Sequence, residues 1–210
     1  MIDSTKITDP YIFCLENTLV KEQCDKIINK FENDLRTHQG TTSGGINLNV
    51  KNSKDLLISD YRNTDWKEED ALFFNIINNS VRQYYEHLNS NHDLTRFTTG
   101  ELFKYSPYSQ YITDTGYQIQ KTDPGKGYVW HDDFFHDNEK ARELTYILYL
   151  NDVDEGWTQF YNGDQISPRA GRVIIFPATW TYVHQGYPPL QTKYLMTGWI
   201  HCNLEPNGKN

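Results

Sequence analysis

A histidine and an aspartate stand two residues apart in a short aromatic segment of the chain. His131 and Asp133 lie in the run Tyr-Val-Trp-His-Asp-Asp-Phe, which starts at Tyr128. In a β-strand, residues i and i+2 project from the same face, so this imidazole and carboxylate are expected to point the same way. An imidazole nitrogen beside a carboxylate oxygen supplies two of the three ligands of a facial metal site.

The third ligand of such a site must come from another part of the chain. His184 is the best candidate, because it follows a β-type run and precedes a Gly-Tyr-Pro-Pro turn. Two histidines and one carboxylate leave the opposite coordination positions open, an arrangement suited to non-haem Fe(II). The His-x-Asp pair alone is a weak signal, because two such residues on a strand are more often a surface pair.

A lysine at the start of the last predicted strand strengthens the signal. Lys193 shares one strand face with Leu195, Thr197, Trp199 and His201. If that face looks into a barrel, Lys193 is a cation in an apolar interior, where desolvation makes an unpaired charge costly. An anionic ligand such as a dicarboxylate cosubstrate would be its partner; the alternative is an exposed lysine on an edge strand.

Helices are predicted in the first half of the chain. A strand at 11–15 precedes helices at 21–35 and 66–88, with Asp65 as the N-cap of the second helix. Both helices are expected to pack against a sheet, the alternative being free-standing interaction elements. The segment 37–55 is rich in Gly, Thr, Ser and Asn and is predicted to be an exposed loop. The apolar stripes are Cys24, Ile27, Ile28, Phe31 and Leu35 in the first helix, and Ala71, Phe74, Ile77, Val81, Tyr84, Tyr85 and Leu88 in the second.

Short β-type runs separated by turn residues fill the second half of the chain. Strands are predicted at 98–105, 116–121, 128–132, 142–150, 158–161, 172–176, 181–184 and 194–202. A series of short strands of this kind indicates a sandwich, jelly roll or barrel, and argues against a parallel α/β sheet.

The composition fits one globular domain. Aromatic residues make up 14% of the 210 residues, which argues against disorder. The net charge of −8 argues against bulk binding to nucleic acid or to anionic membranes. The three cysteines fit neither a disulfide framework nor a zinc motif, and the apolar runs are too short for a membrane span. We therefore expect a soluble, cytoplasmic protein without a signal peptide.

Taken together, these residues resemble the 2-oxoglutarate- and Fe(II)-dependent oxygenases of the prolyl 4-hydroxylase type. The resemblance covers about 118–199 and the segment 11–31. Each motif alone is common, but all of them in this order and at family-like spacings form a strong signal. The motifs are Tyr128-x-x-His131-x-Asp133, Arg142-x-x-Thr145, Tyr149-Leu150-Asn151, Gly156-x-Thr158, Pro168-x-x-Gly171, Phe176-Pro177, His184-x-Gly186, and Lys193-Tyr194 with Trp199.

This resemblance implies a mainly β fold in a single domain, 1–210. A double-stranded β-helix (jelly-roll) core would occupy about 97–202, with supporting N-terminal α-helices within about 15–92. The resemblance also implies roles for nine side chains: iron on His131, Asp133 and His184, 2-oxoglutarate on Lys193, Tyr149 and Thr158, and substrate contacts from Tyr128, Arg142 and Trp199. Fe(II), 2-oxoglutarate and O2 are the implied cofactor and cosubstrates, with ascorbate as a candidate reductant.

The implied reaction is hydroxylation of a prolyl residue in a peptide or protein, with decarboxylation of 2-oxoglutarate to succinate. Two alternatives stay open: a hydroxylase of free proline or another small metabolite, and a non-catalytic metal-binding jelly-roll protein. The chain departs from the family pattern in two places. Lys121 or Thr122 stands where many relatives carry a tyrosine before the first metal histidine, and a Gly-Gly-Glu-Thr motif is shortened to Gly156-Trp157-Thr158.

Overall fold

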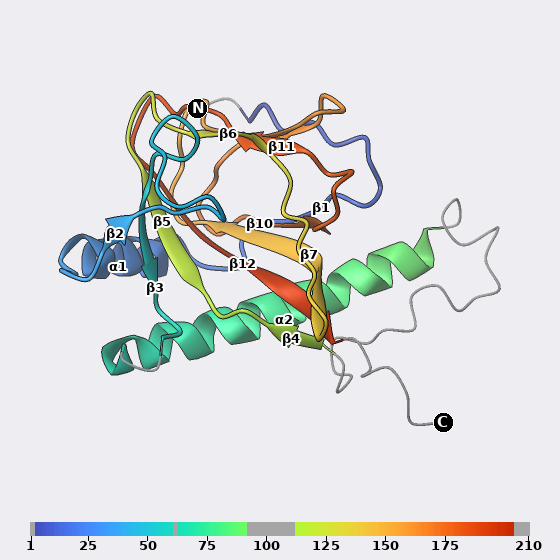
Figure 1. Cartoon of the computed structure of the whole chain (residues 1–210), viewed down its shortest axis with the longest axis horizontal. Coiled ribbons are helices and arrows are strands. Elements are labelled where there is room, and N and C mark those ends of the chain that lie inside the picture. Colours follow the sequence, from blue (N-terminus) through green and yellow to red (C-terminus); the bar gives the residue numbers. More distant parts are fainter. Residues whose placement is uncertain (1–2, 61–62, 92–111, 204–210) are drawn as a thin grey trace.

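In the part of the chain that the structure describes, two antiparallel sheets face each other, and two helices cover the outer face of the larger sheet (Figure 1). The computed structural model describes residues 3–60, 63–91 and 112–203 of the chain. The strand predicted at 98–105 lies outside the described residues. The architecture is that of the double-stranded β-helix, or jelly roll, which the motifs imply.

The larger sheet runs in the order β1-β10-β7-β12-β5-β3-β2, and β4 pairs with β12. Long-range pairs therefore hold it together, because the central neighbours β7 and β12 are far apart in the chain. The strands are β1 Phe13–Leu15, β2 His38–Gln39, β3 Lys54–Leu57, β4 Ile112–Asp114, β5 Gln118–Thr122, β7 Lys140–Tyr149, β10 Val173–Pro177 and β12 Lys193–Asn203.

The smaller sheet runs in the order β6-β11-β8-β9. Its strands are β6 Tyr128–His131, β8 Thr158–Phe160, β9 Gln165–Ile166 and β11 His184–Gly186. The prediction of a strand at 181–184 is wrong, because the Tyr182 amide closes a turn on the Thr179 carbonyl and pairing begins only at His184. That shift matters because it places His184 at the start of β11.

Alternate residues of β7 face two different environments. Leu144, Tyr146 and Leu148 belong to the core under the helices, whereas Ile147 and Tyr149 belong to the core between the two sheets. This alternation follows from the two-residue period of a strand. One face of β7 and of β12 therefore points toward the space between the two sheets, where it can line a site.

The helices are α1, Lys21–Glu32, and α2, Lys67–Ser90, with a 3-10 turn at Thr64–Trp66 before α2. Both pack on the large sheet through the helix-side core. Neither helix combines the length and apolar character that a membrane span needs, within the residues described.

The apolar stripes of the two helices were predicted with three errors. Leu35 lies beyond the end of α1 and is 99% exposed. Phe73, four residues before the buried Ile77, faces the core, whereas Phe74 and Ala71 are exposed. The physical reason is the helical period, which brings residues four apart to one face, so Phe73 packs inward together with Ile77 and Val81.

Two further predictions about the first half of the chain are wrong. Asp65 makes no capping hydrogen bond to α2, because its carboxylate pairs with Arg36 at 2.7 Å. The segment 37–55 is not simply an exposed loop. It contains β2 and the start of β3, and it buries Lys51, Ser53 and Asp55.

Candidate metal centre and its cavity

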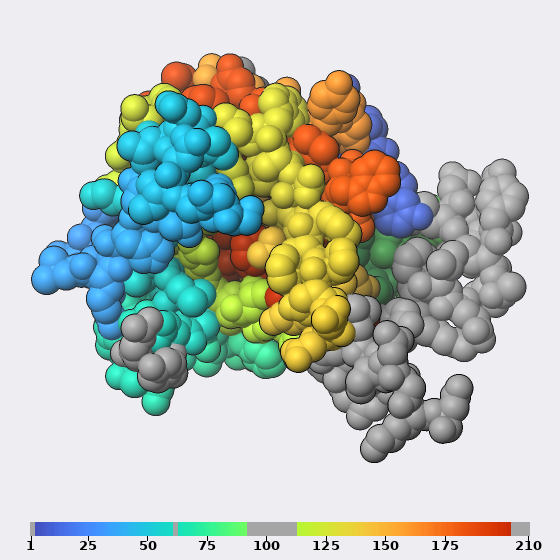
Figure 2. All heavy atoms as spheres, in the orientation of Figure 1, coloured from blue at the N-terminus to red at the C-terminus, as the bar shows by residue number. Residues whose placement is uncertain are grey.

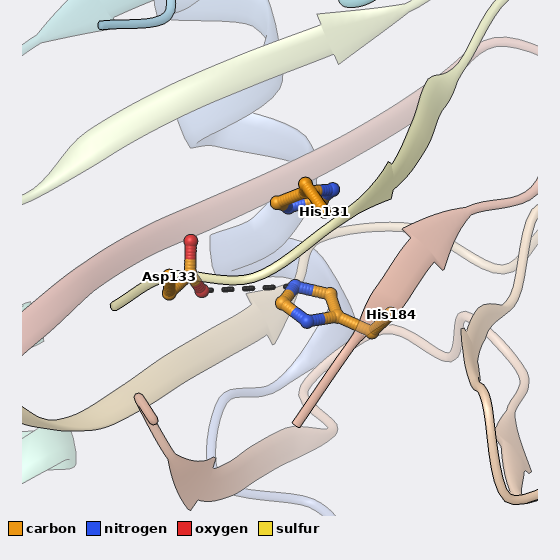
Figure 3. A group of neighbouring side chains, drawn as sticks. All are labelled: His131, Asp133 and His184. Atoms are coloured by element: carbon orange, nitrogen blue, oxygen red, sulfur yellow. Dashed lines mark ion pairs between the residues drawn. The ribbon is translucent and has the colours of Figure 1, made fainter. Parts of the chain in front are cut away.

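Pairing of β6 with β11 brings His131 and His184 together. The two residues are direct partners in the antiparallel register, which places their ring centroids 4.3 Å apart. Asp133 lies two residues beyond His131, just after β6 ends, and its Oδ2 is 3.6 Å from His184 Nε2. Figure 3 shows the three side chains converging, and their potential ligand atoms all lie within 4.8 Å of one another.

Backbone carbonyls orient both imidazoles. Nδ1 of His131 lies 2.7 Å from the Val129 carbonyl oxygen, and Nδ1 of His184 lies 2.9 Å from that of Tyr182. A carbonyl only accepts, so we assign the ring proton to Nδ1 in both histidines. Each Nε2 then keeps its lone pair for a metal, an arrangement typical of metal-binding histidines.

Burial and neighbouring groups shift the pKa values of His131 and Asp133. Burial, followed by the neighbouring His184, lowers the pKa of His131 to about 4, so this ring is neutral at neutral pH. Burial alone raises the pKa of Asp133. The two imidazoles, the Thr145 hydroxyl and the Trp199 indole outweigh that effect, so the carboxyl pKa lies below its usual value. The donor set is therefore two imidazoles, of which the His131 ring is neutral, and one carboxylate, which fits non-haem Fe(II).

A cavity of about 500 Å³ opens beside this triad, between the two sheets. Figure 2 shows a hollow between the blue segment near residue 45 and the yellow segment near residue 130, with red β12 atoms at its base. Eight of the nine side chains assigned a role by the resemblance line the cavity: Tyr128, His131, Asp133, Arg142, Thr158, His184, Lys193 and Trp199. The ninth, Tyr149, is fully buried behind the wall and shares a 2.6 Å hydrogen bond with the Thr158 hydroxyl.

Lys193 is the isolated cation that its strand position predicts. Its side chain is 3% exposed, and Nζ donates a 2.6 Å hydrogen bond to the Gly156 carbonyl oxygen. Burial lowers the pKa of Lys193 to about 8. Within the described part of the chain, no carboxylate forms an ion pair with this ammonium. A cavity-lining cation without an acidic partner is suited to an anionic ligand.

Aromatic rings form the other walls near the triad. The Tyr128 ring stacks on that of His131 with centroids 3.5 Å apart. The Arg142 guanidinium lies 3.7 Å above the Trp199 ring, and its Nη1 donates to the backbone carbonyl of Asp133. These contacts place the three proposed substrate residues around the metal centre.

The structure also resolves the two departures from the family pattern. Thr122 lines the cavity, whereas Lys121 points away from it and pairs with Glu32 at 2.8 Å. Trp157 stacks on Tyr187 with centroids 4.6 Å apart and is not among the cavity-lining residues.

Sequence reasoning missed a second polar group on the cavity wall. Lys51, Ser53 and Gln118 line the cavity around the buried carboxylate of Asp55. The polar, Gly-rich composition of 37–55 gave no signal of this burial. Sequence reasoning also gave no separate role to Thr145, whose hydroxyl donates to Asp133 Oδ2 at 2.8 Å.

Comparison with known families agrees with the geometry. Residues 117–201 match the family model of the 2OG-Fe(II) oxygenase superfamily. This range contains the triad and Lys193. No curated protein sequence matches the chain significantly.

Three solved structures share the fold at low sequence identity. A viral collagen prolyl hydroxylase from Paramecium Bursaria Chlorella virus-1, in a 2OG complex, is 18% identical with a TM-score of 0.57, covering 91% of this chain and 96% of its own. A prolyl hydroxylase from Trichoplax adhaerens, in complex with a hypoxia inducible factor peptide fragment, is 17% identical and has a TM-score of 0.64. The match covers 91% of this chain and 83% of that chain. A Pseudomonas putida prolyl-4-hydroxylase is 16% identical with a TM-score of 0.59, covering 90% and 91%.

Proposed function

We propose that this chain, a 2-oxoglutarate- and Fe(II)-dependent dioxygenase by its family match and ligand set, hydroxylates a prolyl residue in a peptide or protein. The observation that carries the proposal is the meeting of His131, Asp133 and His184 in a cavity that also holds Lys193. Iron bound there would couple decarboxylation of 2-oxoglutarate to succinate with insertion of one oxygen atom from O2 into a C–H bond.

In this proposal, His131, Asp133 and His184 hold the iron, and Lys193 binds the distal carboxylate of 2-oxoglutarate. A charge-assisted hydrogen bond from a buried ammonium is strong, because little water competes for it. Thr158 lines the same cavity, and Tyr149 fixes its hydroxyl from behind. We assign both to the cosubstrate pocket, with Thr158 in contact and Tyr149 in support.

The substrate side of the cavity is aromatic. Tyr128, Arg142 and Trp199 surround the metal centre, and the Arg142–Trp199 stack gives a flat wall for a pyrrolidine ring. These side chains would position the C–H bond and exclude water from it. The peptide bound to the Trichoplax neighbour supports a peptide as substrate, because that enzyme shares this fold.

Turnover of 2-oxoglutarate tests the proposal. The purified chain with Fe(II), 2-oxoglutarate and ascorbate is assayed for succinate, alone, with proline-containing peptides, with their alanine counterparts and with free proline. We expect a proline peptide to stimulate succinate formation and to gain the mass of one oxygen atom. His131→Ala and Asp133→Ala should abolish both signals.

Each other outcome contradicts a named part of the proposal. No 2-oxoglutarate-dependent succinate would rule out the dioxygenase and leave a non-catalytic metal-binding protein. Stimulation by free proline alone would show a small-metabolite hydroxylase instead. The cytoplasmic location stays a prediction, which imaging of the tagged full chain in its host would test.

A further inference from the structure

A buried carboxylate organises three polar side chains on the cavity wall. Asp55 is fully buried and accepts from Lys51 Nζ at 2.7 Å, Gln118 Nε2 at 2.6 Å and Ser53 Oγ at 2.7 Å. The three donors line the cavity, whereas Asp55 lies behind them. We call Lys51, Ser53 and Gln118 the polar wall.

The polar wall is fixed next to the metal centre. Backbone hydrogen bonds join 50–52 to 127–129, and Lys51 is the bridge partner of Tyr128. Lys51 Nζ lies 5.7 Å from the centroid of the Tyr128 ring, which in turn stacks on His131. A group bound at the triad would therefore lie one aromatic ring away from Lys51.

Gly40 indicates that this arrangement is closely packed. A Cβ atom at Gly40 would lie 2.4 Å from Ser53 Oγ and 3.1 Å from Lys51 Cε. Any side chain there would displace the polar wall. Three features therefore restrict the positions of these side chains. They are the hydrogen bonds to Asp55, the backbone pairing with 127–129 and the close approach of Gly40.

We propose that the polar wall binds a main-chain carbonyl oxygen of the peptide substrate, with Lys51 as the donor and Asp55 as a positioning residue. This inference rests on the proposed function and deepens it, since it names the part of the peptide that is recognised. Lys51 has three N–H donors, and Asp55 is its one hydrogen-bond acceptor among the described residues. Two donors remain for a ligand.

Charge balance favours an uncharged acceptor over a carboxylate. Lys51 and Asp55 form a buried pair with no net charge, whereas Lys193 has no acidic partner among the residues described. A lone buried cation attracts an anion strongly, but a compensated cation does so much less. The two lysines would thus bind different ligands. Lys193 would bind the anionic cosubstrate, and Lys51 would bind the neutral main chain of the peptide.

The double variant Lys51→Met/Asp55→Asn tests this inference, because it removes the donor without leaving a buried carboxylate unpaired. Affinity is measured by fluorescence anisotropy with a labelled proline peptide, and peptide-independent succinate formation is measured in parallel. We expect at least a tenfold loss of peptide affinity, with an unchanged KM for 2-oxoglutarate. Lys54→Met, an exposed lysine of β3, is the matched control and should bind peptide normally.

A second variant and a modified ligand guard against a folding artefact. Gly40→Ala keeps every polar side chain but displaces them, and it should also weaken peptide binding. Peptides in which an alkene replaces one amide beside the proline lack a single carbonyl oxygen. The proline has one amide on its N-terminal side and one on its C-terminal side. Replacing one of these two amides should weaken peptide binding to the wild-type chain but should not weaken it further in the double variant.

Two results would overturn the inference: equal peptide affinity of the wild-type and double-variant chains, or a raised KM for 2-oxoglutarate in the variant, which would assign the wall to the cosubstrate. Failure of the proposed function would look different. It would appear in the wild-type chain itself, as absence of peptide-stimulated succinate.

Discussion

At the candidate metal centre, the buried hydroxyl of Thr145 orients the carboxylate of Asp133. Thr145 donates to Asp133 Oδ2 at 2.8 Å from the neighbouring sheet. Partners of this kind orient a ligand, and their loss commonly costs about 10–100-fold in metal affinity. Thr145→Val keeps the shape and removes the donor, so we expect the Kd for Fe(II), measured by calorimetry without oxygen, to rise by about that factor.

Thr197→Val is the control for this experiment. Thr197 is also buried on the cavity wall, but its hydroxyl donates to the Tyr146 carbonyl rather than to the triad. Its variant should bind Fe(II) like the wild-type chain. Equal Kd values for all three proteins would show that Thr145 has no part in holding the carboxylate.

The isolated charge of Lys193 predicts a pH dependence for the cosubstrate. Burial lowers its pKa to about 8, below the value of an exposed lysine. The charged form therefore predominates below pH 8 and is lost above it. A bound dicarboxylate requires the charged form, so the KM for 2-oxoglutarate should be flat below about pH 8 and rise up to about tenfold per pH unit above it.

Two variants of Lys193 separate its charge from its shape. Lys193→Ala should raise the KM for 2-oxoglutarate by about 10–100-fold at neutral pH, the value of a hydrogen bond to a charged group. Lys193→Arg keeps its charge at every pH tested, so any remaining activity should lose the rise above pH 8. An unchanged KM for 2-oxoglutarate in Lys193→Ala would show that Lys193 does not bind the cosubstrate.

The meeting of two of the proposed metal ligands could be predicted from the sequence, because strand geometry relates His131 and Asp133. The two-residue spacing predicted that His131 and Asp133 converge, although Asp133 lies just past the end of β6. Lys51 could not be predicted in the same way. Its burial depends on the pairing of β3 with β5 and on the bridge to Tyr128, which are long-range contacts without a local pattern.

At the scale of elements, α2 offers a matched pair of aromatic residues. Phe73 is fully buried in the helix-side core, and its neighbour Phe74 is 48% exposed. Phe73→Ala should lower the free energy of unfolding by about 3–5 kcal/mol, because it leaves a cavity. Phe74→Ala should change it by less than about 1 kcal/mol. Urea titrations measure both, and equal losses would contradict the packing of this helix.

Most elements were predictable from their patterns, but two strands in the first half of the chain were not. The alternation in β7 and β12 and the helical periods gave the right element types. Strands β2 and β3 were missed because they lie within or next to the polar, glycine-rich segment 37–55, which has the composition of a loop. Their strand character comes from long-range pairing, because β3 pairs with β5 and β2 pairs with β3.

For the whole molecule, we predict that residues 1–210 unfold as one domain. One continuous core joins α1 and α2 to the central strands, for example through Phe31, Phe73 and Leu148. Small single domains unfold in one cooperative step, so tryptophan fluorescence and far-UV circular dichroism should report the same midpoint. Two separated transitions would contradict a single domain.

The proposed activity requires one iron ion held by all three side chains of the triad, and a crystal of the chain grown with Fe(II) tests this most directly. The measurement is the anomalous difference map at the iron absorption edge. We predict one strong peak within bonding distance of His131 Nε2, His184 Nε2 and a carboxylate oxygen of Asp133. A peak at other residues, or a His184 ring turned away from the metal, would contradict the proposed centre.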